Sequence, residues 1–361
     1  MVRPDALFPP KPSLKGRQAE LALLSRTIIQ AAPTRLALVG PGGCGKTMLA
    51  SALGHRLAPF FGGRVHWFRV GAWDFRTLSE MFALRFGTTR GDGRLRELRR
   101  FLRGAGPQLI VLDNHEDDRA TARLLDAFAR TEASFIITAR RCLLGGVLIF
   151  PVTAPLVTSG KVAFPRVAKL TRVLRFNPLA LDIADGIVSS GAATVAALER
   201  ALLEKGIDRV VPIEHEDDLP EVALLVDWAW RRLSRESRRM LGVLAHIEGD
   251  HVDRDSLAAL ARVRSSPGRA LSALLAFHLV QEPVAGRFTL HAVVRHAVRR
   301  RTQSAHERVF EHYVSLLERE PERLLLEQTH LFAAMDHAHR TSNLGAMLRV
   351  ERLIQQLDGR A

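Results

Sequence analysis

Eight consecutive residues, 40–47, carry the clearest chemistry in this chain. They read Gly-Pro-Gly-Gly-Cys-Gly-Lys-Thr and fit the pattern G-x-x-x-x-G-K-[ST], in which backbone N–H groups turn inward around a phosphate chain. Lys46 would place its charge on the β- and γ-phosphates, and the Thr47 hydroxyl would bind Mg²⁺. The pattern therefore predicts a nucleoside triphosphate site. Its expected binding residues are Gly40, Pro41, Gly42, Gly43, Cys44, Gly45, Lys46, Thr47 and Met48.

An acid follows an apolar run further along the chain. Residues 109–112 read Leu-Ile-Val-Leu, and Asp113 comes next, which is the Walker B pattern whose carboxylate holds the nucleotide's Mg²⁺. Hydrolysis also needs a group that polarises the attacking water. Asn114 cannot act as a base, so Glu116 is the nearest candidate, and we expect slow turnover.

A third polar group ends another apolar run, where residues 138–140 read Thr-Ala-Arg after Phe-Ile-Ile. A guanidinium pairs strongly with phosphate oxygens, so Arg140 could report whether a γ-phosphate is present. The alternative is an ordinary surface arginine. We expect Lys46, Asp113, Glu116 and Arg140 to form the catalytic set, and Thr47 with Asp113 to bind Mg²⁺.

Short apolar runs that alternate with helical patterns would position these groups. Their spacing predicts an α/β P-loop NTPase with a five-stranded parallel, ASCE-like sheet that is covered by helices on both faces. The expected strands are residues 36–39, 65–70, 108–112, 134–138 and 147–152. The last strand lies in an apolar run, 142–157, that is too short for a membrane span and contains Pro151 and Pro155, so we expect a buried strand instead.

Two other patterns favour ordinary surface roles. Residues 94–103 form a predicted helix with five arginines, which we interpret as a solvated face rather than a phosphate-binding patch. The tetrad His-Glu-Asp-Asp occurs at 115–118 and again at 215–218. One copy follows a strand and the other lies in a predicted linker, so we interpret the repeat as coincidence and not as metal ligands.

Composition bounds the remaining possibilities. The chain has 361 residues, 47% of them hydrophobic, and a net charge of +14, but only six of its 52 basic residues are lysines. We attribute the 46 arginines as much to a GC-rich genome as to a nucleic-acid surface. Cys44 and Cys142 form no framework, and the N-terminus has no signal-peptide core, so we expect a cytoplasmic protein without a membrane partner.

Taken together, the motifs resemble the STAND ATPases of the NB-ARC type, as found in bacterial members. Residues 15–21, Lys-Gly-Arg-Gln-Ala-Glu-Leu, are similar to the h-G-R-x-x-E segment that precedes the family's P-loop. Residues 112–114 and 138–140 are similar to its Walker B and sensor motifs. Residues 177–181, Asn-Pro-Leu-Ala-Leu, are similar to its G-x-P-L-A-L motif.

The resemblance continues to about residue 302. Residues 224–301 look like the family's winged-helix domain, and they end in Phe-Thr-Leu-His where the family has its M-H-D motif. The resemblance implies that Arg17 lies near the base or ribose, Pro178 contacts adenine, and His291 touches the β-phosphate of ADP. Ala292 replaces the M-H-D aspartate, which removes an ionic contact expected to steady the ADP-bound form.

Five parts are expected along the chain: an N-terminal segment (1–25), a nucleotide-binding domain (26–156), a helical domain (157–218), a winged-helix domain (219–302) and tetratricopeptide-like helices (303–361). An acidic break at 214–220 is the predicted linker. No strand alternation is evident from residue 154 to about 280. In the winged helix, we expect Ser234 to cap a helix, residues 281–287 to form the wing turn, and the small, apolar residues 266–278 to form a packed third helix.

The resulting hypothesis is an ATP/ADP switch with slow Mg²⁺-dependent hydrolysis and self-association on ATP binding, together with an unknown effector or sensor protein. The alternative is a DNA-associated AAA+-like ATPase that uses the winged helix and the arginine-rich surface. A scaffold that keeps ADP permanently is a third interpretation.

Overall fold

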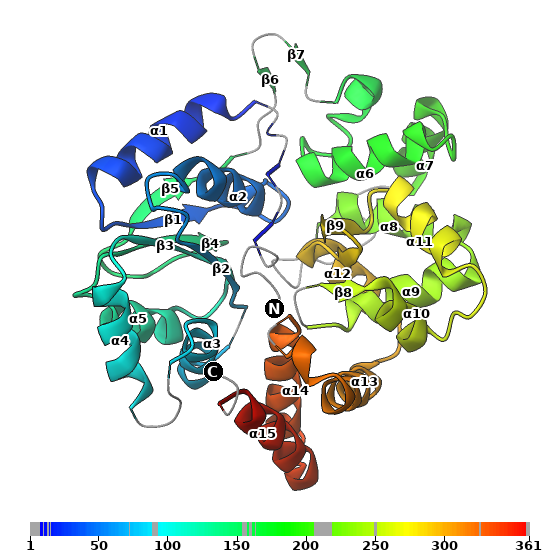
Figure 1. Ribbon diagram of the computed structural model, residues 1–361. Helices are drawn as coiled ribbons and strands as arrows, with labels where there is room; N and C mark the ends of the chain where they lie inside the picture. The colour runs from blue at the N-terminus through cyan, green and yellow to red at the C-terminus, as the bar shows by residue number, and fades with distance from the viewer. Residues whose placement is uncertain are drawn as a thin grey trace. The chain divides into compact units, whose positions relative to one another are not determined.

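A parallel sheet of five strands forms the centre of the first part of the fold (Figure 1). Its order is β2-β3-β4-β1-β5, so β4 lies between the P-loop strand and the Walker B strand, which is the ASCE arrangement. The strands are β1 (Arg35–Val39), β2 (Val65–Arg69), β3 (Gln108–His115), β4 (Ala133–Ala139) and β5 (Leu148–Pro151). All pairings are parallel, which confirms the predicted sheet.

The computed structural model describes residues 8–9, 11–12, 14, 16–71, 73–88, 93–153, 157–158, 161–162, 164–205, 219–248, 251–324 and 326–358. The chain divides into two units. The first comprises Met1–Gly40, Lys46–Val152 and Tyr313–Ala361, and the second comprises Pro41–Gly45 and Thr153–His312. The tip of the P-loop, Pro41–Gly45, thus groups with the second unit.

Helices cover both faces of the sheet in the first unit. Figure 1 shows α1 and α2 on one face and α3, α4 and α5 on the other. They span Gln18–Gln30, Lys46–Leu57, Phe75–Arg85, Arg94–Gly104 and Asp118–Ala127 in that order. The central strands are therefore buried along their length, as their continuous apolar sequences predicted.

The predicted burial of the last strand is wrong. Leu148 and Ile149 of β5 are 50% and 56% exposed. The strand pairs with β1 on one side only, because it is the edge of the sheet. Elsewhere in the described part of the apolar run, Cys142, Leu144 and Val152 are buried.

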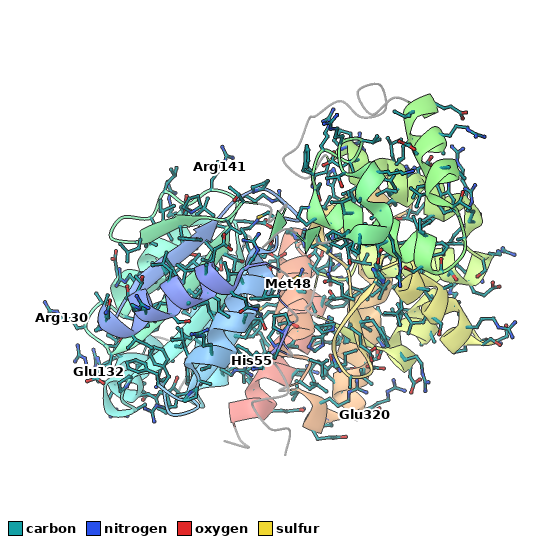
Figure 2. The ribbon with its side chains drawn as sticks, turned by 90° about the horizontal axis from the view of Figure 1, so that it is seen from above. Met48, His55, Arg130, Glu132, Arg141 and Glu320 are labelled. Atoms are coloured by element: carbon teal, nitrogen blue, oxygen red, sulfur yellow. The ribbon has the colours of Figure 1, made fainter. Side chains whose placement is uncertain are left out.

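The described arginines of helix α4 are exposed, as both interpretations of this helix require. Its Leu98 and Leu102 are buried, whereas its described arginines, Arg96, Arg99, Arg100 and Arg103, are exposed. The Arg99 Nε donates to the carbonyl of Ala127, the last residue of α5, and the Arg103 Nε donates to the carbonyl of Arg130, just beyond that helix. The Arg130 side chain itself extends outward (Figure 2).

Helices dominate the second unit, and two small antiparallel sheets accompany them. The strands are β8 (Val252–Asp253), β10 (Arg287–Thr289) and β9 (Gln281–Val284) in one sheet, and β6 (Val157–Thr158) and β7 (Lys161–Val162) in the other. The expectation of no strand before about residue 280 was wrong, because two-residue strands carry no alternation. The helices are η2 (Pro165–Leu170), α6 (Pro178–Ser189), α7 (Val195–Lys205), α8 (Pro220–Arg232), α9 (Arg235–Ala245), α10 (Arg254–Ala261), α11 (Pro267–Ala276) and α12 (Ala292–Arg299).

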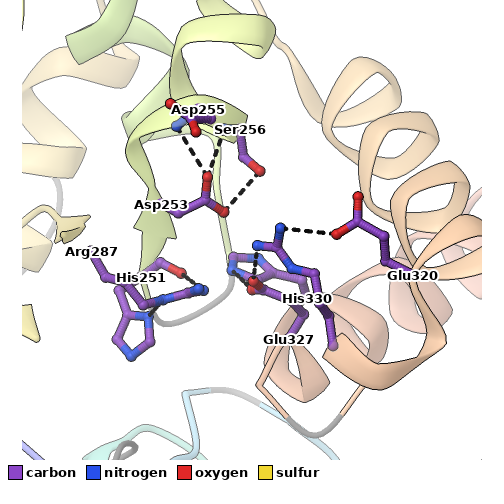
Figure 3. A network of polar contacts seen from close by, with 9 residues as sticks. His251, Asp253, Asp255, Ser256, Arg287, Glu320, Glu327 and His330 are labelled. Atoms are coloured by element: carbon purple, nitrogen blue, oxygen red, sulfur yellow. Dashed lines mark hydrogen bonds and ion pairs between the residues drawn. The ribbon is translucent and has the colours of Figure 1, made fainter. Parts of the chain in front are cut away.

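Local capping explains several of these elements. Ser234 caps α9 by accepting from the Ser237 N–H, as predicted. Asp253 caps α10 by accepting from the N–H groups of Asp255 and Ser256, at 3.1 and 2.8 Å (Figure 3). A turn at Gly286, with φ 75°, joins β9 to β10 within the predicted wing. The linker tetrad at 215–218 lies outside the described residues.

The C-terminal helices are α13 (His306–Arg319), η4 (Pro321–Arg323), α14 (Gln328–Arg340) and α15 (Leu344–Asp358). Within the first unit, Tyr313 stacks on His330 with ring centroids 3.8 Å apart. The fully buried Glu327 accepts from the Arg323 Nη2 at 2.8 Å (Figure 3). No helix formed by the described residues is long and apolar enough to cross a membrane.

Candidate nucleotide site

Three predicted site residues meet at one edge of the parallel sheet. Gly40 follows β1, Asp113 lies near the end of β3, and Arg140 follows β4. The Gly40 N–H donates to the Ala139 carbonyl at 3.2 Å, so the start of the P-loop lies beside the residue that precedes Arg140. Ligands of open α/β sheets bind at the carboxyl ends of the strands, where these residues are.

Polar contacts hold the base of the P-loop. The Lys46 ammonium group donates to the Gly40 carbonyl at 2.7 Å, across the mouth of the loop. Helix α2 begins at Lys46, which places the partial positive charge of a helix N-terminus where phosphates would bind. Met48, on the first turn, is 47% exposed, and it lies on α2 with His55 (Figure 2).

Asp113 is the centre of a hydroxyl network. Its Oδ1 accepts from the Thr47 Oγ1 at 2.8 Å and from the Thr138 Oγ1 at 2.6 Å, and the residue is 6% exposed. The structure therefore brings the two predicted Mg²⁺ ligands together. A hydroxyl and a carboxylate are oxygen ligands that suit Mg²⁺, which takes few protein ligands when nucleotide phosphates supply others.

A β-bulge positions this network. Leu112 pairs with Ile137 and His115 with Ala139, so Asp113 and Asn114 both lie opposite Thr138. Asn114 has φ 60°, and its N–H donates to the Thr138 Oγ1 at 2.9 Å. The bulge leaves no pattern in the sequence apart from an asparagine, a residue that tolerates positive φ.

The predicted water-polarising acid lies next to the bulge. Glu116 is exposed, and its Oε1 accepts from the Asn114 Nδ2 at 2.7 Å. Asn114 therefore cannot be a base but does orient Glu116.

The other members of the tetrad at 115–118 have structural roles. The His115 Nε2 lies 2.8 Å from the Asp118 Oδ1, and Asp117 caps α5. Asp118 also accepts from the Leu143 N–H at 3.3 Å, which ties down the segment after Arg140. Within the described ranges, no three His, Cys, Asp or Glu side chains are grouped to hold a metal ion.

Close packing surrounds the tip of the P-loop within the second unit. A Cβ on Gly42 would lie 2.7 Å from the Val293 Cγ2 of α12. A Cβ on Gly43 would lie 2.8 Å from the Leu179 Cβ and 3.1 Å from the Asn177 Oδ1, both at the start of α6. Gly43 also has φ 76°, whereas Gly42 has no positive φ, so packing alone requires glycine at position 42.

The residues of the proline motif start helix α6. Asn177 caps the helix, and its Oδ1 accepts from the N–H groups of Leu179 and Ala180 at 3.0 and 3.1 Å. Pro178 occupies the first helical position, which suits its fixed φ and its missing N–H. The Asn177 Nδ2 donates to the Glu221 Oε1 at 3.1 Å.

His291 caps helix α12 within the same unit. Its Nδ1 accepts from the Val293 N–H at 3.2 Å, so a neutral His291 ring carries its proton on Nε2. Ala292, which replaces an acid of the resembled motif, is the first residue of the helix.

Arg17 lies at the N-terminal end of α1 in the first unit. It is 3% exposed, and its Nη1 lies 2.7 Å from the Glu20 Oε2. Lys15, from the same motif, lies outside the described residues. Cys44 of the P-loop is buried, as is Cys142.

No family model and no curated protein matches the sequence. Among solved structures, the chain is similar to a STAND (signal transduction ATPase with numerous domains) protein of Pyrococcus horikoshii with a tetratricopeptide repeat sensor. The identity is 16%, the TM-score is 0.57, and the match covers 97% of this chain and 59% of the other. The chain thus spans less than two thirds of that protein.

Weaker likenesses involve two other archaeal proteins. The Orc1 protein of Aeropyrum pernix in complex with DNA is 16% identical, with a TM-score of 0.37 over 83% of this chain and 96% of the other. A Walker-type ATPase of Pyrococcus abyssi is 15% identical, with a TM-score of 0.34 over 83% and 99%. An identity of 16% shows a likeness of fold alone, which this chain shares with the STAND protein.

Proposed function

We propose that this chain is an ATP/ADP-binding switch with slow Mg²⁺-dependent hydrolysis. The observation that carries the proposal is the cluster of Thr47, Asp113 and Thr138 beside the Lys46 loop, at the carboxyl edge of an ASCE sheet. Bound Mg²⁺ would neutralise charge on the phosphates. Lys46 would bind the β- and γ-phosphates, and Arg140 would distinguish ATP from ADP.

Slow turnover follows from the surroundings of Glu116. The acid is exposed and accepts a hydrogen bond from Asn114, so solvent rather than a closed site surrounds it. Such a group orients a water molecule but gives little rate enhancement. A switch benefits from this, because each nucleotide state then persists.

The second unit would read the nucleotide. Under this proposal, Pro178 contacts adenine and the His291 Nε2 donates to the β-phosphate of ADP, while Arg17 contributes near the base or ribose. The hydrogen bond to the His291 Nδ1 supports the donor role, since it leaves the ring proton of the neutral form on Nε2. Residues 219–302 would then act as a winged-helix lever whose release on ATP binding allows self-association and contact with an effector or sensor protein.

A nucleotide shifts such an equilibrium only by its difference in affinity for the two states. A change from 1:99 to 99:1 needs about 5.5 kcal/mol. Ala292 supplies no carboxylate to steady the ADP-bound state, so packing and His291 would have to supply more of this difference.

The DNA-associated alternative finds little support in helix α11. Its Ala270, Leu271 and Leu274 are buried, and Arg269 is the single charged residue among its exposed positions. A recognition helix needs several side chains that bind base edges. Duplex binding with a steep salt dependence would favour the alternative.

The test is to identify nucleotide retained on purification and then to exchange it. Light scattering should give a larger mass with a non-hydrolysable ATP analogue and Mg²⁺ than with ADP. Equal masses in the two states would contradict the switch. Retained ADP that resists exchange, without turnover, would indicate the permanent ADP scaffold instead.

A further inference from the structure

Three helix N-termini meet the tip of the P-loop within the second unit. Gly43 lies against Asn177 and Leu179 at the start of α6. A Cβ on Gly42 would lie 3.7 Å from the Leu219 Cδ1 at the start of α8 and 2.7 Å from Val293 at the start of α12. Helix N-termini carry partial positive charge, so this arrangement suits a loop that binds anions.

A buried acid lies at one of these helix ends. Glu221, in the first turn of α8, is only 3% exposed. Its Oε1 accepts from the Asn177 Nδ2 at 3.1 Å, and its Oε2 has no hydrogen-bond partner among the described residues. A buried carboxylate is costly when it is incompletely paired, and the α8 N-terminus offsets only part of that cost. Stability alone therefore does not account for an acid at this position.

The acid fixes the orientation of one amide. Because a carboxylate only accepts, Nδ2 of Asn177 must face Glu221, and Oδ1 must face the Leu179 and Ala180 N–H groups. In a flipped amide, the Asn177 Oδ1 would face the Glu221 carboxylate, and the Asn177 Nδ2 would face the Leu179 and Ala180 N–H groups. The Oδ1 that is fixed in this way lies 3.1 Å from the Cβ position of Gly43.

We propose that Glu221 is a positioning residue for the nucleotide's phosphates and that it acts through Asn177 on the tip of the P-loop. The proposal rests on the proposed nucleotide-binding function, which it deepens. Glu221 needs only to accept a hydrogen bond from Asn177. Its proposed role therefore requires an acceptor oxygen but not a negative charge. Asn177 and Glu221 then work as one unit.

The experiment compares two ligands that differ by the β-phosphate. Calorimetry measures the affinities for ADP and AMP with Mg²⁺ in the full chain, and the ratio of the two isolates the phosphate contribution. The variants are Glu221→Gln, which retains an acceptor, and Glu221→Met, which has a similar volume but no acceptor. Asn177→Ala and the double variant Asn177→Ala/Glu221→Met complete the set.

Glu221→Gln should keep the preference for ADP over AMP within about twofold. Glu221→Met and Asn177→Ala should each reduce that preference by about five- to tenfold, the size of one net hydrogen bond, and the double variant should lose no more. If Glu221 had only a structural role, its loss would reduce the affinities for ADP and AMP by the same factor and leave their ratio unchanged.

Three results would overturn the proposal: an unchanged ratio in Glu221→Met, a Glu221→Gln ratio as low as that of Glu221→Met, or additive losses in the double variant. Thermal unfolding without nucleotide checks that each variant is folded. Asn177→Ala keeps the test decisive if the Glu221 variants do not fold. If the unmodified chain binds neither ligand, the proposed function fails rather than this inference.

Discussion

The two halves of the P-loop are held in different ways. Its base belongs to the first unit, where Lys46 donates to the Gly40 carbonyl and Thr47 to Asp113. Its tip groups with the second unit, where Leu179 and Val293 occupy the space that a Cβ on Gly43 or Gly42 would need. The base depends on polar groups, and the tip depends on shape.

The two halves of this short motif can therefore serve different purposes. Polar contacts at the base can be exchanged for contacts to a phosphate or a metal, because Lys46 and Thr47 have donors to offer. At the tip, the thiol of Cys44 is only a weak side-chain donor, so phosphate contacts there would come from backbone N–H groups, which packed neighbours hold in place. We therefore expect mutations at the base to weaken nucleotide binding. Mutations at the tip should instead alter the coupling between the bound nucleotide and the second unit.

The largest effect should come from the base. Replacing Lys46 with alanine removes a charge-assisted contact to phosphate, and ADP affinity should fall about 30- to 100-fold by calorimetry. Lys169→Ala, at an exposed position of η2, is the matched control and should leave affinity unchanged. Unchanged ADP affinity in Lys46→Ala would show that the base of the loop does not bind phosphate.

The next effect should come from the tip. Gly42→Ala forces a methyl group against Val293 without backbone strain, and overpacking of this kind costs about 1–3 kcal/mol of unfolding free energy. Val293→Ala should make room and recover part of the loss, so the pair should couple in a double-mutant cycle measured by denaturant unfolding.

Gly145→Ala is the matched control for the tip, because no atom lies within 4 Å of its Cβ position and its φ is not positive. It should change stability by a few tenths of a kcal/mol at most. Additive effects of Gly42→Ala and Val293→Ala would show that the packed contact does not form in solution.

A smaller effect should follow from Thr138→Val at the bulge. The substitution keeps the volume but removes the hydroxyl that donates to Asp113 and accepts from the Asn114 N–H, at a cost of about 1 kcal/mol. Mg²⁺ should also strengthen ADP binding less in this variant than in the unmodified chain, as measured by titrating the metal. Thr27→Val, on an exposed face of α1, should change neither quantity. If Mg²⁺ strengthens ADP binding by Thr138→Val as much as it does in the unmodified chain, the hydroxyl network has no part in metal binding.

The last prediction concerns one histidine in each unit. Burial, followed by the Arg85 guanidinium, lowers the pKa of His66 from 6.5 to about 4, and burial, followed by Arg299, lowers the pKa of His246 to about 4. In the unfolded chain each of these histidines binds a proton below about pH 6.5, whereas in the native chain it does so only below about pH 4. Stability should fall as the pH drops through this window and stay level above it.

Glutamine at either position should flatten the acid limb of a denaturant-midpoint profile between pH 6.5 and pH 4. His339→Gln, at an exposed position of α14, serves as the control. A profile that keeps its full slope in both variants would show that neither histidine is buried in its neutral form.

The sequence predicted the parts whose chemistry is local. The P-loop, the Walker B acid and the five strands each leave a pattern within about ten residues, and the structure confirms the sheet that they build. The exposure of β5 was not predictable, because an apolar run looks the same in a central strand and in an edge strand. The contacts of Gly42 with Val293 and of Asn177 with Glu221 join residues far apart in sequence, and no local pattern records them.

The central claim is that the second unit reads the nucleotide through the tip of the P-loop. The most direct test is hydrogen exchange at the amides of Leu179 and Val293, which donate to the capping side chains of Asn177 and His291 at the starts of α6 and α12. Exchange at these amides should be slow with ADP and at least tenfold faster with a non-hydrolysable ATP analogue and Mg²⁺, while the amides of β3 stay protected in both states. Identical exchange at both helix starts in the two nucleotide states would contradict it.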